Sequence, residues 1–109
     1  MAGAVVEVTE TNFSEEVLHA TTPAVVDMWA AWCGPCRLLA PVMEELAGTY
    51  QGKMKFVKLN VDDYPQIAAQ YRIMNIPTLL VFKGGQEIDR IVGVQPKEEL
   101  IRRLEQAFA

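Results

Sequence analysis

Cysteine is scarce in this chain of 109 residues, because only two occur and both lie within residues 33–36. The framework of several disulfides on which many small secreted proteins depend is therefore excluded. Histidine is scarcer still, with His19 alone. Since a structural zinc site needs four ligands, the two cysteines could supply only half of one. At this length a single domain over residues 1–109 can bury a hydrophobic core without cross-links.

Long runs of one kind of residue are missing as well. No apolar stretch approaches the roughly 20 residues of a membrane-spanning helix, and the N-terminus lacks the basic lead and apolar centre of a secretory signal. Basic residues are scattered and the net charge is −4, which argues against a nucleic-acid partner. We therefore expect a cytoplasmic monomer that binds neither membrane nor nucleic acid.

Hydrophobic periodicity and turn residues divide the chain into alternating strands and helices. Strands are predicted near Val5–Val8 and at 24–30, 54–61, 79–82 and 88–92, and helices at 12–19, at 36–50, soon after residue 63 and from Pro96 onward. Asn12 is expected to cap the first helix, and Asp62 and Asp63 the third. The order predicts an α/β fold, a central mixed five-stranded sheet flanked by four helices, with a hairpin at residues 84–85.

Both cysteines lie in the segment Trp32-Cys33-Gly34-Pro35-Cys36, where a predicted buried strand gives way to a helix. Two thiols at this spacing can close a small ring, and the positive end of the helix dipole favours a thiolate at the first. Cys33 is predicted to be the reachable nucleophile, and Cys36 the shielded thiol that resolves a mixed disulfide. No cation lies between them to stabilise the thiolate further, which favours a reductant over an oxidant.

Two charged residues interrupt the predicted buried strands. Asp27 lies in the middle of one, and Lys58 lies in the next on the same face as Met54 and Phe56. A buried carboxylate is costly unless it is paired, protonated or useful. Two interpretations follow: a buried ion pair, or a role for Asp27 in taking the proton of Cys36 through a water molecule.

Taken together, these features resemble the thioredoxin family over essentially the whole chain. The resemblance is carried by the strand and cysteine motif at 26–36, Pro41, and the segments 58–62, 76–79 and 92–93. A bare Cys-x-x-Cys is only moderately specific, whereas this motif framed by that strand and followed by Ile-Pro-Thr is very specific. Arg37 and Met28 stand where the family more often has Lys and Phe, and neither departure disturbs the assignment.

The resemblance implies the thioredoxin fold and a protein disulfide reductase without a cofactor or metal of its own. Its partners would be disulfide-containing client proteins and an NADPH-dependent thioredoxin reductase. It also implies a cis bond before Pro77, with the backbone of residues 74–76 pairing with an extended substrate. The expected catalytic residues are Cys33, Cys36, Asp27 and Lys58, and the expected substrate-binding residues are Trp32, Gly34, Pro35, Met74, Ile76, Pro77, Gly93 and Val94.

Two other classes of function remain open at this point. A non-catalytic binding module would use the same apolar rim to dock a partner and would survive replacement of both cysteines by Ser. A metal or iron–sulfur carrier would bridge two chains through the paired cysteines, and metal analysis of the purified protein would reveal it.

Overall fold

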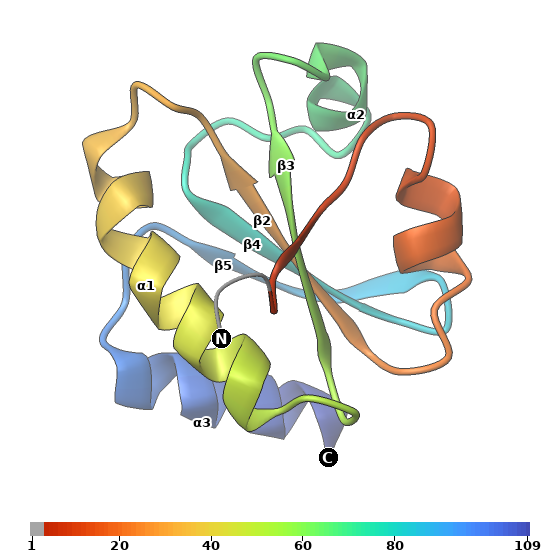
Figure 1. Ribbon diagram of the computed structural model, residues 1–109, viewed down its shortest axis with the longest axis vertical. Coiled ribbons are helices and arrows are strands. Elements are labelled where there is room, and N and C mark those ends of the chain that lie inside the picture. The colour runs from red at the N-terminus through yellow and green to blue at the C-terminus, as the bar shows by residue number, and fades with distance from the viewer. Residues whose placement is uncertain (1–3) are drawn as a thin grey trace.

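A five-stranded mixed sheet forms the centre of the molecule, in the computed structural model that describes residues 4–109 (Figure 1). The strands are β1 (Val6–Glu7), β2 (Ala24–Trp29), β3 (Lys55–Asn60), β4 (Thr78–Lys83) and β5 (Gln86–Val92). Their order across the sheet is β1-β3-β2-β4-β5. The first three strands run parallel to one another, and β4 and β5 add the antiparallel edge that the hairpin predicted.

Four helical segments cover the sheet in the described part of the chain. They are η1 (Ser14–Leu18), α1 (Gly34–Thr49), α2 (Pro65–Gln70) and α3 (Lys97–Phe108). The predicted α/β fold with five strands and four helices is thus confirmed, although η1 is one turn of π-helix. Helix α1 starts two residues before the predicted position and continues through Pro41.

The two helix caps predicted from the sequence are wrong. Asn12 does not cap η1, because its Oδ1 accepts the backbone N–H of Thr9 at 2.7 Å. Neither Asp62 nor Asp63 caps α2, which begins at Pro65 without a side-chain cap. The Oδ1 of Asn60 instead accepts the N–H of Asp62 at 2.9 Å and so closes the turn after β3.

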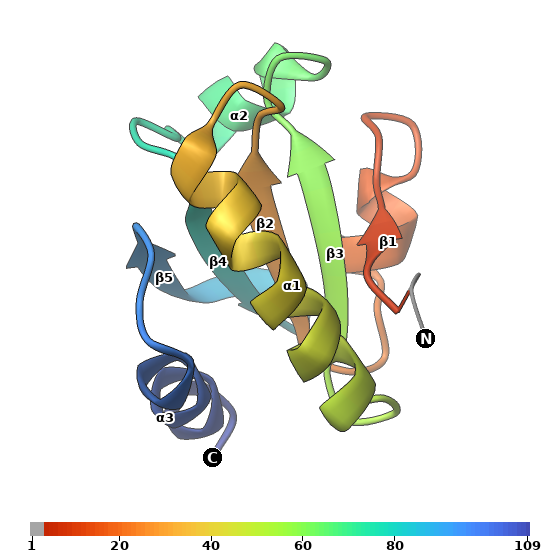
Figure 2. The same cartoon turned by 60° about the vertical axis from the view of Figure 1, so that its left-hand side comes forward.

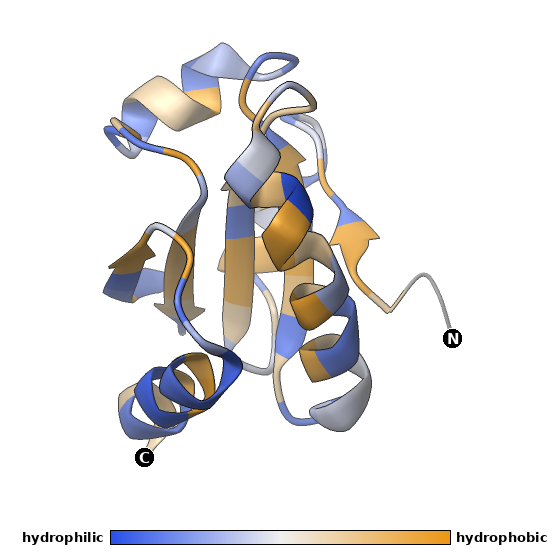
Figure 3. Cartoon of the chain, turned by 90° about the vertical axis from the view of Figure 1, so that its left-hand side faces the viewer, coloured by the Kyte–Doolittle hydropathy of each residue, from blue (hydrophilic) through white to orange (hydrophobic). Residues whose placement is uncertain are grey.

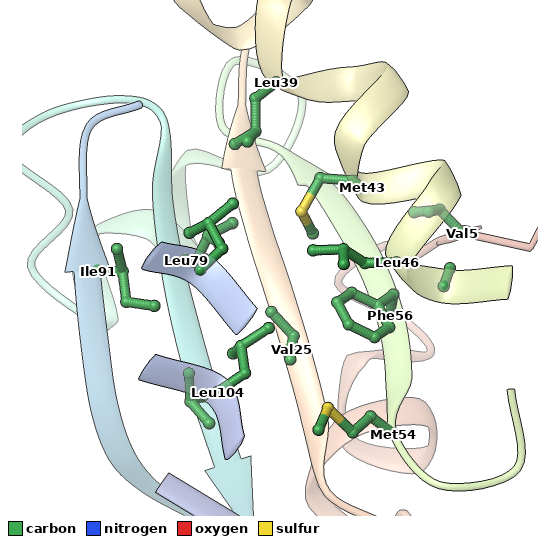
Figure 4. Packing of buried hydrophobic residues seen from close by; sticks show 13 residues of the cluster. Val5, Val25, Leu39, Met43, Leu46, Met54, Phe56, Leu79, Ile91 and Leu104 are labelled. Atoms are coloured by element: carbon green, nitrogen blue, oxygen red, sulfur yellow. The ribbon is translucent and has the colours of Figure 1, made fainter. Parts of the chain in front are cut away.

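Hydrophobic side chains fill both faces of the sheet. On one face α1 and α3 pack against alternate residues of the strands, including Val25, Phe56 and Leu79 (Figures 2 and 4). On the other face η1 and α2 cover the intervening residues, among them Val26 and Leu80. This two-sided burial explains why the central strands read as nearly continuous apolar runs.

The outer surface is polar where the helices meet water, and Figure 3 shows hydrophilic residues along the outer side of α3. Among residues 4–109, no helix is both long enough and apolar enough to cross a membrane.

Candidate active site

The connections at one edge of the sheet bring the predicted site residues together. Strands β2 and β3 are parallel and both end at this edge, where α1 also begins (Figure 2). Strand β4 is antiparallel to β2 and therefore starts there, and β5 is antiparallel to β4 and ends there. The segments that follow β2, β3 and β5, and the one that precedes β4, thus meet although they are far apart in the sequence.

Cys33 and Cys36 form a disulfide at the start of α1. Cys33 is the N-cap residue of the helix, and its Sγ accepts the backbone N–H of Cys36 at 3.2 Å. A hydrogen bond from a backbone N–H, together with the positive end of the helix dipole, also favours a thiolate at this sulfur when the bond is reduced. The geometry gives the two cysteines unequal environments, as the sequence predicted.

The exposure of the two cysteines does not differ in the disulfide form. Each residue is only 3% exposed, so the expectation that Cys33 is more reachable than Cys36 is not met in this state. The reason is packing, because Trp29, Val61 and Ile76 close around the bridge. Gly34 and Pro35, between the cysteines, are exposed.

The segment before β4 lies against the first cysteine. Cys33 Sγ is 3.9 Å from the carbonyl oxygen of Ile76, and the bond between Ile76 and Pro77 is cis, as the resemblance implied. The Pro77 carbonyl accepts the N–H of Gly93 at 2.8 Å. Val94, the next residue, is exposed. The backbone at residues 76–77 therefore lies between Cys33 on one side and Gly93, just after β5, on the other.

Trp32, which is 68% exposed, forms one wall of a surface groove beside the disulfide. The groove measures about 390 Å³ and also includes Met74 and Ile76. Its other lining residues come from the turn after β3, from α2 and from the segment that follows α2: Val61, Pro65, Ala68, Ala69, Ile73 and Asn75. The sequence correctly predicted an exposed Trp32. Of the expected apolar rim, however, Pro77, Gly93 and Val94 lie outside this groove.

Asp62 holds Trp32 in place, a role that the sequence analysis missed. The indole Nε1 of Trp32 donates a hydrogen bond to Asp62 Oδ2 at 2.8 Å. One signal could have indicated this contact: Asp62 follows β3 as Trp32 follows β2, and residues just past adjacent parallel strands lie at the same edge. Arg37 braces the same loop, since its Nη1 donates to the Ala31 carbonyl at 3.1 Å.

Asp27 is buried in β2 on the sheet face that α1 covers, between Val25 and Trp29 in the alternation of the strand. Burial raises the pKa of Asp27 to about 7, although the positive charge of Lys58 lowers it in part. Among residues 4–109, no donor lies within hydrogen-bond distance of Asp27 Oδ1. A carboxyl group in this state can both hold and release a proton near neutral pH.

Lys58 lies beside Asp27 in the register of β2 and β3, on the predicted face. The ion pairs within 4.0 Å among residues 4–109 are made by other side chains, so the simple ion-pair interpretation is not supported. Lys58 Nζ lies 5.2 Å from the centre of the Trp29 ring, a distance typical of a cation–π contact. The lysine therefore acts on Asp27 through its field rather than through direct contact.

In the described part of the chain, no group of three or more His, Cys, Asp or Glu side chains is arranged to hold a metal ion. His19 is exposed at the C-terminal end of η1, where its Nδ1 lies 3.2 Å from the Ser14 carbonyl oxygen.

Comparison with known proteins places these features in a family. The family model described as Thioredoxin matches residues 4–106. The chain is 53% identical over 102 residues to Thioredoxin 1 of Nostoc sp., covering 94% of this chain and 95% of that protein. It is 52% identical over 99 residues to a thioredoxin of Synechocystis sp., covering 91% and 92%. It is 50% identical over 106 residues to Thioredoxin 2 of Chlorobaculum tepidum, covering 97% of each.

Proposed function

Since the chain belongs to the thioredoxin family, we propose a specific division of labour within its disulfide exchange reaction. The protein is a thiol–disulfide oxidoreductase that uses a Cys-Gly-Pro-Cys motif. In our proposal Cys33 attacks the client and Cys36 completes the reaction. The observation that carries this assignment is the disulfide at the start of α1, with the Cys36 N–H directed at Cys33 Sγ.

The reaction begins from the dithiol. The Cys33 thiolate attacks one sulfur of a client disulfide, so that a bond forms between Cys33 and the client while the other client sulfur leaves as a thiolate. Cys36, once deprotonated, then attacks Cys33 Sγ and releases the second client sulfur. The client gains two electrons and two protons, and the chain is left with the Cys33–Cys36 bond.

Asp27 is the residue that we assign to accept the proton from Cys36, through a water molecule, before the second attack. Its place on the sheet face under α1 and its pKa of about 7 support this role, because a useful proton acceptor titrates near the working pH. Lys58 acts as a positioning residue: its charge keeps the Asp27 pKa from rising further.

Client proteins dock, in this proposal, on the exposed surface around the disulfide. Trp32, Met74 and Ile76 provide the groove on one side, while Gly34, Pro35, Pro77, Gly93 and Val94 provide the remaining contacts. An extended client segment would pair with the backbone of residues 74–76, next to the sulfur under attack. Apolar contacts and backbone hydrogen bonds suit a reductase that serves many clients, because neither demands one client sequence.

The oxidised chain must be reduced again, and we propose an NADPH-dependent thioredoxin reductase as the partner that does so, with a monomer as its substrate. We also propose the cytoplasm as the compartment. A dithiol that donates electrons needs surroundings that keep it reduced.

Trapping of the mixed disulfide tests the assignment of the two thiols. The Cys36→Ser variant should accumulate a covalent complex with a disulfide-bearing client, which a thiol reductant releases, whereas Cys33→Ser should form none. Accumulation in Cys33→Ser but not in Cys36→Ser would reverse the roles. If the variant with both cysteines replaced by Ser still bound its partner and kept the function of the native chain, a non-catalytic binding module would be favoured instead.

The midpoint potential of the Cys33–Cys36 pair, measured in a dithiol redox buffer, tests the direction of electron flow. We expect a value below that of the glutathione pool, as a donor of electrons requires. A value well above the pool would indicate an oxidant or isomerase with the same fold. The metal content and visible absorbance of the purified protein distinguish these redox functions from that of a metal or iron–sulfur carrier, which would bridge two chains.

A further inference from the structure

Met74 stands apart from the other methionines in the described part of the chain. Met74 is 85% exposed, whereas Met28, Met43 and Met54 are no more than 9% exposed. A small oxidant dissolved in water therefore meets the thioether of Met74 while the core shields the other three. Exposure is one of the main factors that determine which sulfur is oxidised.

The position of Met74 gives that exposure a consequence. It lines the groove of about 390 Å³ beside the disulfide, together with Trp32, Ile73 and Ile76. Apart from Asn75, the side chains that line this groove are apolar. A flexible thioether suits such a surface, since methionine adapts its shape to different apolar partners.

The state of the cysteines adds a second observation. In the disulfide form Cys33 and Cys36 carry no thiol and are almost wholly buried. Among residues 4–109, Met74 then carries the one solvent-exposed sulfur. Peroxide that reaches the oxidised chain would thus react at the groove rather than at the redox pair.

We propose that Met74 is a site of reversible oxidation by hydrogen peroxide, and that the resulting sulfoxide weakens the docking of clients in the groove. The second part rests on the proposed function. In the reaction the thioether sulfur attacks one peroxide oxygen, the O–O bond breaks, a sulfur–oxygen bond forms and water is released. Sulfur loses two electrons and the peroxide gains them. A methionine sulfoxide reductase restores the thioether.

The sulfoxide changes the surface in a way that opposes docking. It replaces an apolar, flexible group by a polar one that must give up water when a client covers it. Losing about half of the apolar burial of a methionine corresponds to a KM for the client that is roughly fivefold higher. The chemical step uses the cysteines and should keep its kcat.

Mass spectrometry tests the modification itself. The disulfide form is treated with hydrogen peroxide, the excess is removed with catalase, and the protein is reduced and digested with trypsin. Met74 is then the single methionine of the peptide 73–83, and Met43 that of the peptide 38–53. We expect one added oxygen on peptide 73–83 well before peptide 38–53 changes. Equal rates in the two peptides, or no oxygen on 73–83, would overturn the proposal.

Kinetics test the effect on docking. KM and kcat for a protein disulfide client are measured before and after peroxide treatment, in the native chain and in Met74→Leu, with each untreated protein as its own reference. We expect KM to rise roughly fivefold in the native chain and to stay unchanged in Met74→Leu. Equal rises in both would overturn the docking effect. If the untreated chain reduced no client, the proposed function would fail with it, whereas the mass result would still establish the modification.

Discussion

Asp27 lies directly opposite Lys58 in the register of β2 and β3, yet the two charges do not meet in an ion pair. The Lys58 ammonium group lies near the Trp29 ring, 5.2 Å from its centre, and one oxygen of Asp27 accepts no hydrogen bond from the part of the chain that the structure describes. The effect of burial therefore outweighs the attraction of the Lys58 charge, and the pKa of Asp27 is raised to about 7. Two predictions depend on this relationship.

The first concerns the rate of the second step of exchange. Asp27 can accept a proton only as a carboxylate, so release of the mixed disulfide should slow as the pH falls through about 7. Asp27→Asn should slow release on the order of a hundredfold and remove this titration. Stopped-flow measurement of client release between pH 5 and 9 checks both, with the exposed Asp63→Asn as the matched control. A pH–rate profile that is unchanged in Asp27→Asn would disprove the assigned role.

The second prediction concerns stability. The Asp27 pKa is about 7 in the folded chain and 3.8 is its ordinary value. At pH 3 the Asp27 carboxyl group is mostly protonated in both the folded and the unfolded chain, so its ionisation hardly changes the free energy of unfolding. As the pH rises from about 4 to about 7, the unfolded chain gains stability by ionising first, so folding is progressively weakened.

Asp27→Asn should remove this penalty, raising the free energy of unfolding by up to about 4 kcal/mol at pH 8 and by little at pH 3.5. Urea unfolding at the two pH values measures the difference, and Asp63→Asn again serves as the control. A gain of the same size at both pH values would show that the effect does not come from the titration of Asp27.

A third prediction concerns the hydrogen bond between Trp32 and Asp62. Asp62→Ala removes the acceptor 2.8 Å from the indole N–H, and Trp32 should become more mobile. The KM for clients should rise about threefold, while stability changes by less than about 1 kcal/mol because the bond is exposed. Fluorescence anisotropy of Trp32 in a Trp29→Phe background reports the motion. Asp63→Ala, one residue away, should leave anisotropy and KM as they were.

A fourth prediction concerns the hairpin between β4 and β5. Gly84 and Gly85 both have positive φ, at +60° and +80°, so Ala at either position should cost about 1 kcal/mol. A Cβ on Gly84 meets open space, whereas one on Gly85 would lie 3.1 Å from the Leu18 carbonyl oxygen. Gly85→Ala should therefore be the more destabilising by about 1 kcal/mol, as urea midpoints would show. Equal losses of stability in the two variants would mean that the backbone near Leu18 moves aside without an energetic penalty.

Much of the fold followed from local patterns. The apolar runs of β2 and β3, the periodicity of α1 and α3 and the Gly84-Gly85 turn each appear within a short window of sequence. The face of the sheet on which a strand residue lies also follows from the alternation of side chains along the strand, which correctly placed Lys58 on the same face as Phe56. The helix caps failed because several side chains compete for the same backbone groups. Asn60, rather than Asp62 or Asp63, closes the turn after β3.

The site was predictable in its chemistry but not in its full extent. The cysteine motif and the exposure of Trp32 could be inferred from adjacent residues. The contact between Trp32 and Asp62 spans 30 residues of sequence and depends on which strands are neighbours. The contribution of α2 to the groove depends likewise on how that short helix packs. The cis bond before Pro77 came from the resemblance, because sequence alone favours trans.

The candidate active site lies at one end of the sheet, and the opposite end is free of its residues. The cysteines, Asp62 and Ile76 lie at the end of the sheet where α1 begins. The turn at residues 50–54, between α1 and β3, lies at the opposite end (Figure 2). Residues 51–53 of that turn are exposed. A dye or a solid support attached there would leave the opposite end of the sheet, where the cysteines lie, uncovered. The molecule is thus suited to immobilisation, as a reagent that could be recharged and reused with its working edge free.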